Sequence, residues 1–114
     1  MKLKKIRVRL KDIHHGKILY VAHPQFGIVT VKIVSKPYAI RVGGLPTLFI
    51  ETIPLDYDWW DKTKTDSRSL SDMGVYNMYG YRRTFHTRKQ AEQYIARFKN
   101  ECLTKTCNIF HLVS

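Results

Sequence analysis

Apolar and basic residues alternate strictly over residues 5–11, at the start of the chain. Successive side chains of a β-strand point to opposite faces, so this pattern predicts a strand with one buried face. Ile6, Val8 and Leu10 would then point inward, and Lys5, Arg7, Arg9 and Lys11 would form an outward row of cations.

Further strands are predicted by short runs rich in β-branched and apolar residues, separated by turn residues. They cover residues 18–23, residues 28–35 with a continuation past Pro37, and residues 47–53. Turns are expected at residues 24–27 and 43–46, and Pro37 must lie at a sheet edge, a bulge or a strand start. This spacing favours a small, strongly bent sheet over alternating strands and helices.

The second half of the chain is less regular. Residues 54–74 show no periodicity and predict a long acidic and aromatic loop, whereas residues 75–86 predict a strand or a hairpin. Apolar residues at helical spacing predict one helix over residues 88–101, with Thr87 as its N-cap and Gln90 three positions later. A last strand is expected at residues 107–113.

These elements predict an α+β fold in a single domain of 114 residues. A bent antiparallel sheet or an SH3-like barrel would be formed by residues 5–53, followed by the loop at 54–74. A strand–helix–strand unit would occupy residues 75–114, with the apolar stripe of the helix packed on the sheet.

Charge narrows the choice of partners. The net charge is +11, yet six of the nine acidic residues lie within residues 51–72. A basic surface usually serves a polyanion or an acidic protein. Nucleic acid, DNA or RNA, is therefore the leading partner and an acidic host protein the alternative, while the oligomeric state stays open.

The N-terminal row of cations has the spacing of a phosphate-binding edge. Side chains on one face of a strand repeat every ~6.7 Å, and the fork of arginine matches phosphate oxygens. The alternative is that the charges only keep an edge strand soluble. The proposed phosphate contacts in this segment are Lys5, Arg7, Arg9 and Lys11.

A second candidate site lies at residues 79–89, where aromatic and basic residues are interleaved. Aromatic rings can stack on bases while cations hold the backbone, and a helix N-terminus favours an anion. The alternative is that the aromatic residues belong to the core and the arginines to a solvated rim. The candidates are Tyr79, Tyr81, Arg82, Arg83, Arg88 and Lys89.

Two adjacent tryptophans, Trp59 and Trp60, lie in the predicted loop. Tryptophan is enriched where proteins bind partners, so both are candidate anchors for a protein interface, and Trp59 is also a candidate for base stacking. The alternative is that one of them packs on the core and fixes the loop.

Catalytic and metal signatures are missing from the sequence. No defensible nucleophile–base order, carboxylate pair or phosphate-binding glycine loop occurs, so we expect no enzymatic activity and no cofactor. Cys102, Cys107 and His111 lack the paired spacing typical of structural zinc, and we expect no metal. No signal peptide and no membrane-spanning run is recognised, which favours a cytoplasmic protein without a membrane partner.

Two segments resemble known proteins. Residues 12–23, DIHHGKILYVAH, resemble the entry of a KOW-type SH3-like barrel, through Asp12, Gly16, Lys17, Tyr20 and Val21. The segment RRTFHTRKQAEQYIARF resembles the strand and capped helix that end many small accessory proteins of tailed bacteriophages. The resemblance implies a phage protein in the cytoplasm of a bacterial host, where such proteins often bind DNA, RNA or a host protein.

The sequence therefore predicts a non-enzymatic protein that binds the nucleic-acid backbone and modulates host processes. The alternative is a phage-type inhibitor that binds an acidic surface of a host protein or defence complex.

Overall fold

The structure is a computed structural model that describes residues 8–76 and 80–104. Within these ranges a six-stranded antiparallel sheet has the order β3-β4-β2-β1-β6, with β5 paired to β4. A short 3-10 helix, η1 (Leu10–Asp12), precedes the sheet, and the helix α2 (Arg88–Thr104) follows it. The strands are β1 (Ile18–His23), β2 (Gly27–Ile33), β3 (Tyr38–Val42), β4 (Leu45–Pro54), β5 (Asp66–Ser69) and β6 (Arg83–Phe85).

The long strand β4 connects the two ends of the sheet. On one edge its Glu51 carbonyl accepts a hydrogen bond from the Val34 amide, which follows β2, and on the other its Leu48 carbonyl accepts one from Leu70, which follows β5. β2 and β3 therefore succeed one another along one edge of β4. Ile33 pairs with Thr52 and Tyr38 with Phe49, so the chain between β2 and β3 holds two more residues than the stretch opposite. This bulge contains Pro37, which has no amide hydrogen to donate to a ladder.

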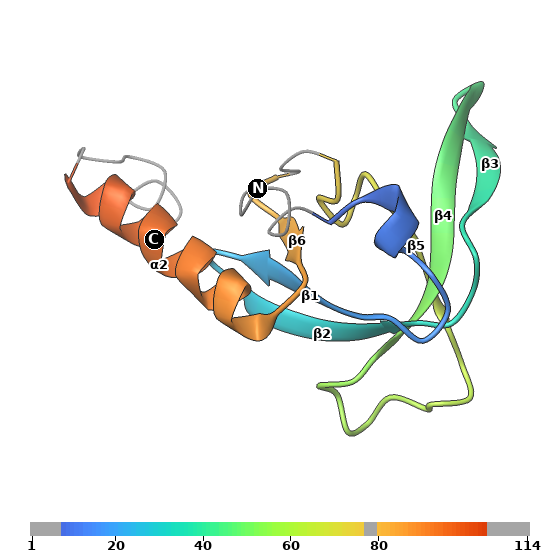
Figure 1. Ribbon diagram of the computed structural model, residues 1–114, viewed down its shortest axis with the longest axis horizontal. Helices are drawn as coiled ribbons and strands as arrows, with labels where there is room; N and C mark the ends of the chain where they lie inside the picture. The colour runs from blue at the N-terminus through green and yellow to red at the C-terminus, as the bar shows by residue number, and fades with distance from the viewer. Residues whose placement is uncertain (1–7, 77–79, 105–114) are drawn as a thin grey trace.

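The sheet curls into a half-barrel, as Figure 1 shows. The helix α2 packs against β1, β2 and β6 at one end, whereas the β3–β4 hairpin extends from the other end. The predicted α+β class, with a bent antiparallel sheet and a C-terminal helix on it, is confirmed. The SH3-like barrel is not confirmed.

The main hydrophobic core lies on one face of β1 and β2. Leu19 and Val21 from β1 and Val31 and Ile33 from β2 all point to this face, as the alternation of a strand requires. The core is completed from outside these strands by Val8, Ile13, Ile50, Leu70, Met73 and Val75.

A second, smaller core lies on the opposite face of the same strands. Ala22 packs there with Phe85 of β6 and with Ala91 on α2, and Tyr94 and Ile95 of the helix cover them. The predicted apolar stripe of the helix is thus the surface that packs on the sheet. β1 and β2 are covered on both sides, which explains why their sequences contain long apolar runs.

The predicted strand over residues 5–11 is wrong in the part of that range that the structure describes. Residues 10–12 form η1 instead, and the Leu10 side chain is 48% exposed rather than directed inward. The Asp12 carboxylate accepts a hydrogen bond from the Arg9 amide at 2.9 Å, and the Asp12 amide donates to the Arg9 carbonyl at 2.9 Å. Such local bonds of an aspartate compete with a strand ladder.

Several other boundaries differ from the prediction: β2 already ends at Ile33, β4 begins at Leu45, and α2 continues to Thr104. β5 lies inside the predicted loop and pairs with β4. Its sequence DSRS is entirely polar, so no apolar alternation indicated a strand there. Of residues 75–76 and 80–86, which the structure describes, Arg83–Phe85 form a strand, β6. The predicted last strand at 107–113 lies outside the described residues.

The segment 70–75 is a compact turn that packs against β6. The Thr84 hydroxyl donates to the Met73 carbonyl, and the Thr84 amide donates to the Gly74 carbonyl at 3.4 Å. Gly74 has a φ of +75°, and a Cβ atom there would lie 2.2 Å from the Arg82 carbonyl oxygen. Only glycine fits both this conformation and this close contact.

We expect the substitution Gly74→Ala to reduce the free energy of unfolding by at least ~2 kcal/mol, because it combines a strained φ with a backbone clash. Chemical denaturation monitored by circular dichroism measures the change. Gly44→Ala is the matched control, since Gly44 has a φ of +83° but nothing within 4 Å of the added atom. Equal losses of unfolding free energy in both variants would show that the close contact with Arg82 contributes nothing to the effect of Gly74→Ala.

Candidate functional site

The predicted N-terminal row of cations is only partly described. Arg9 and Lys11 are exposed beside and within η1, whereas Lys5 and Arg7 lie outside the described residues, as does Tyr79. Because residues 9–12 form a turn rather than a strand, the regular spacing expected for Arg9 and Lys11 is not present. Both side chains remain available to an anionic partner.

Arg82 and Arg83 lie on opposite faces of the sheet. Arg82 Nη1 donates to the Asp72 carboxylate and to the Asp72 carbonyl, each at 3.0 Å, on the face of the main core. Arg83 is close enough to Tyr94 of α2 for its charge to act on that residue's pKa, which burial raises and Arg83 lowers. The two arginines therefore do not serve one continuous surface.

The N-terminus of α2 is capped as predicted. The Gln90 amide donates to the Thr87 hydroxyl at 3.1 Å. Arg88 Nη2 donates to the Thr30 hydroxyl at 3.1 Å and lies 3.8 Å from the Asp56 carboxylate, while its guanidinium is 5.8 Å from the centre of the Tyr20 ring. Lys89, the next predicted contact, is exposed.

Tyr81 is half-buried rather than free at the surface. Its ring meets Phe98 edge-on, with the centroids 5.3 Å apart, and its carbonyl accepts a hydrogen bond from the Tyr94 hydroxyl at 2.8 Å. Its φ of +69° is rare for a residue other than glycine. These contacts hold Tyr81 between the sheet and α2.

The two tryptophans have different environments in the loop between β4 and β5. Trp60 donates its indole N–H to the Lys64 carbonyl at 2.9 Å and so fixes the loop. Trp59 is 76% exposed and stacks on Tyr57, with the rings inclined by only 11° and their centroids 5.3 Å apart. Tyr57 and Trp59 form an exposed aromatic pair.

The β3–β4 hairpin has its turn where the sequence predicted one, but its exposure to solvent was not predicted. Gly43 and Gly44 form a two-residue turn with φ values of +60° and +83°, typical of a tight hairpin. The strands beside this turn carry apolar side chains in solvent, and Arg41 Nη1 donates to the Gly44 carbonyl at 2.7 Å. The exposed apolar residues are Ile40 at 44%, Val42 at 51% and Leu45 at 70%.

The only acidic residue of the hairpin strands lies far from the turn. Glu51 accepts hydrogen bonds from Thr65, Tyr38 and Ser67, which lower the pKa of its carboxyl group in that order. Its charge is thereby held at the base of the hairpin. The signal in the sequence was the absence of Asp and Glu between Asp12 and Glu51, combined with a Gly-Gly turn.

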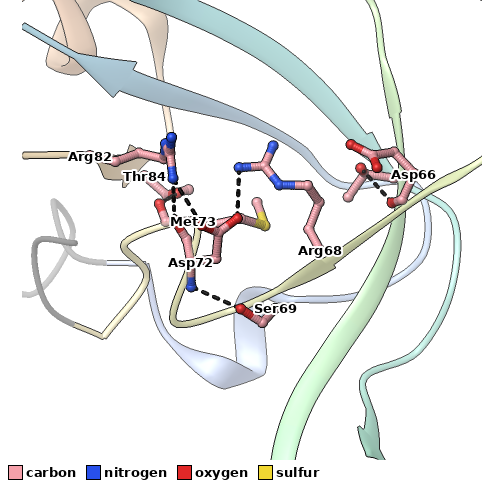
Figure 2. A network of polar contacts seen from close by, with 8 residues as sticks. Asp66, Arg68, Ser69, Asp72, Met73, Arg82 and Thr84 are labelled. Atoms are coloured by element: carbon pink, nitrogen blue, oxygen red, sulfur yellow. Dashed lines mark hydrogen bonds and ion pairs between the residues drawn. The ribbon is translucent and has the colours of Figure 1, made fainter. Parts of the chain in front are cut away.

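A pocket of about 160 Å³ opens between the β1–β2 turn and two arginines from distant elements. Asp72 connects these arginines, because its Oδ1 is 3.0 Å from Arg82 Nη1 and its Oδ2 is 3.4 Å from Arg68 Nη2. Figure 2 shows the two guanidinium groups on either side of the Asp72 carboxylate. The lining residues are Val21, His23, Phe26, Gly27, Val29, Arg68 and Arg82.

The imidazole of His23 lies in this pocket in a defined orientation. Its Nδ1 accepts hydrogen bonds from the amides of Gln25 at 3.0 Å and Phe26 at 3.3 Å. Burial lowers the pKa of His23, the positive charge of Arg82 lowers it further, and a hydrogen bond to the backbone of Gly80 acts in the opposite direction. The lowered pKa favours the neutral ring, as two amide donors to Nδ1 require.

Two absences hold for residues 8–76 and 80–104. There, no three residues among His, Cys, Asp and Glu are placed to hold a metal ion together. Over the same ranges no helix has the length and apolar character needed to span a membrane.

Comparison with known proteins supplies the family. The family model described as Phage g100-like protein matches residues 7–98, which is well over half of the chain. The chain belongs to the phage g100-like family. The expected relation to phage proteins is thereby confirmed. No curated protein and no solved structure shows significant similarity to this family member.

We expect the pKa of His23 in the folded protein to lie below 6.5 and to rise when Arg82→Gln removes the neighbouring charge. In the wild type, the lowered pKa means that the unfolded chain binds the His23 proton more readily than the folded protein does. His23 should therefore lower the free energy of unfolding as the pH falls below 6.5 towards its folded pKa. A pH titration of the imidazole signals by NMR measures the pKa. Arg97→Gln is the control, since Arg97 is an exposed residue of α2. A pKa at or above 6.5 in the wild type would contradict this assignment.

Proposed function

We propose that this phage protein binds nucleic acid without enzymatic activity, mainly through the phosphate backbone, and that it acts in the cytoplasm of the bacterial host. The observation that carries the proposal is the β3–β4 hairpin, whose turn exposes apolar side chains and Arg41 to solvent. An isolated hairpin with both faces in water is marginally stable. Its exposed apolar residues are better explained by a partner than by folding.

The form of the hairpin suits a nucleic-acid groove. Two-stranded β-ribbons enter the major or the minor groove of a duplex, and minor-groove proteins that bend DNA insert apolar residues between base steps. Leu45 and Pro46 directly follow the Gly-Gly turn, and Leu45 is 70% exposed. These residues would enter the groove, while Arg41 would contact a phosphate or a base edge.

Charge supports an anionic partner for this hairpin. The chain carries a net charge of +11 and no acidic residue between Asp12 and Glu51. Each neutralised phosphate releases counterions, which gives affinity without sequence preference. Lys17, Lys32, Lys36 and Arg41 lie in this acid-free stretch.

The remaining cations contribute unequally to the proposed interface. Arg9, Lys11 and Lys89 are exposed and would contact phosphates, as would Lys5 and Arg7 in the segment outside the described residues. Arg82 and Arg88 have carboxylates within 4 Å, so their charges are partly compensated. We therefore expect less from these two arginines than from the hairpin.

We expect Arg41→Gln and Leu45→Ser each to weaken binding to a duplex oligonucleotide about fivefold or more, because one removes a phosphate contact and the other an inserted side chain. Fluorescence anisotropy at 50–200 mM salt measures both affinity and salt dependence. Wild-type affinity should fall steeply with salt, and Arg41→Gln should reduce that slope by about one.

Arg97→Gln is the matched control for charge, because it removes one arginine from the exposed surface of α2. Equal losses for Arg41→Gln and Arg97→Gln would show that only net charge matters. Affinity that does not change with salt would contradict the proposal as a whole.

A second candidate function is binding to an acidic surface of a host protein. The observation in its favour is the pair of Tyr57 and Trp59, since Trp59 is 76% exposed and preorganised by stacking. Large aromatic side chains often dominate the affinity of protein interfaces. The basic surface would then accelerate association.

We expect Trp59→Ala to leave duplex binding unchanged if nucleic acid is the partner, and to abolish capture of a defined host protein if the second function holds. Pull-down from a nuclease-treated bacterial lysate, compared with anisotropy on the same variants, separates the two. Leu10→Ala is the control, because Leu10 is another large apolar residue, 48% exposed, on a different element. Equal retention of the captured protein by the wild type and Trp59→Ala would exclude this surface.

A further inference from the structure

Of the pocket residues His23, Phe26, Arg68 and Arg82, the proposed function uses only Arg82, and assigns it a small contribution. We propose that this pocket binds the phosphate group of a nucleotide, with the base stacked on Phe26. This site is separate from the β3–β4 hairpin, and its ligand is a single nucleotide unit rather than a continuous backbone. The inference therefore goes beyond the proposed function.

The guanidinium groups retain hydrogen-bonding capacity. Within the described parts of the chain, the polar contacts of Arg68 use Nη2, and those of Arg82 use Nη1. The other terminal nitrogen of each points away from Asp72, to the same side in Figure 2. Two arginines face one carboxylate, so a positive charge is left over at this end of the pocket. Phosphate oxygens match the fork geometry of arginine.

Asp72 fixes the positions of both arginines. Its amide donates to the Ser69 hydroxyl at 3.0 Å, which anchors the turn that carries the carboxylate. Arg68 side-chain exposure is 18% and that of Arg82 is 30%, so neither guanidinium moves freely in solvent. Preorganised donors bind an anion more strongly than flexible surface side chains do.

The pocket is also lined by aromatic side chains. Phe26 is 75% exposed, yet its backbone is fixed because its amide donates to His23 Nδ1. The ring centroids of His23 and Phe26 are 4.4 Å apart, and the two ring planes are inclined by 32°. Stacking of a base on an aromatic ring strengthens binding whichever base it is, because every base has a π-face. Val21 and Val29 add apolar lining to the pocket.

The volume of the pocket limits how much of the ligand it can enclose. Its volume of about 160 Å³ is below the roughly 300–1,000 Å³ of pockets that enclose a whole drug-sized ligand. One phosphate with part of a sugar would fill it, and the base would remain outside. Phe26 lines the pocket and is 75% exposed, so its ring is accessible to such a base.

A nucleoside with a terminal phosphate can come from two sources, a free mononucleotide and the 5′-phosphate end of a nucleic-acid strand. We would test both by NMR and isothermal titration with AMP, adenosine, and a short single-stranded oligonucleotide with and without a 5′-phosphate. The proposal expects AMP to shift the signals of His23 and Phe26, and adenosine to bind at least about tenfold more weakly, because charge-assisted hydrogen bonds are lost. A preference of about tenfold for the 5′-phosphorylated oligonucleotide over its 5′-hydroxyl form identifies strand ends as the source, and AMP binding without that preference identifies the free nucleotide.

The variants distinguish a binding role from a purely structural one. Arg68→Gln should weaken AMP binding about tenfold, and Phe26→Ala about fivefold or more. Phe26 is exposed, so its substitution leaves the fold intact even if Arg68→Gln destabilises the protein. Arg97→Gln, which removes the same charge from an exposed position of α2 that does not line the pocket, should leave AMP binding unchanged.

Failure of this inference is distinguishable from failure of the proposed function. If AMP and the 5′-phosphorylated strand leave the signals of His23 and Phe26 unchanged, the pocket is not a nucleotide site, whatever the duplex affinity. Equal weakening by Arg68→Gln and Arg97→Gln would likewise overturn the inference, because it would show attraction by net charge alone. Loss of duplex binding in Arg41→Gln with retained AMP binding would support two separate sites.

Discussion

The contact between the turn at residues 70–75 and strand β6 is the constraint on which the rest of this structure depends. Gly74 lies so close to the Arg82 carbonyl that no side chain fits between them, and Thr84 is hydrogen-bonded to the Met73 carbonyl. This contact places Leu70, Met73 and Val75 against β1 and β2 and so completes the main core. It also brings Asp72 to Arg82, which forms one side of the pocket.

The surfaces available to partners all lie at the periphery of this framework. The β3–β4 hairpin extends from one end of the sheet, the loop with Trp59 connects β4 to β5, and the pocket opens beside the β1–β2 turn. Each presents exposed apolar or aromatic side chains, Leu45 on the hairpin, Trp59 in the loop and Phe26 at the pocket. Functional residues commonly lie on loops and turns that a scaffold of regular elements positions.

Much of the fold could be predicted because local patterns agree with the tertiary structure. β1 has the predicted bounds of residues 18–23, Thr87 caps α2, and Ala91, Tyr94 and Ile95 cover the second core. The errors occur where a long-range or side-chain contact decides the backbone. Asp12 bonds to Arg9 and forms η1, and the polar segment DSRS becomes β5 only because β4 offers a free edge. The periodicity of these segments contains no information about the residues with which they pair.

The sequence by itself determined the α+β class, the central strands, the capped helix and the strong excess of positive charge, because these follow from periodicity, turn residues and composition. The tertiary structure decided where that charge is available. It separated Arg82 from Arg83 across the sheet and placed aspartates beside Arg82 and Arg88. It also left the β3–β4 hairpin uncovered and brought Arg68 to Arg82. These outcomes depend on contacts between residues distant in the chain, which a one-dimensional pattern does not contain.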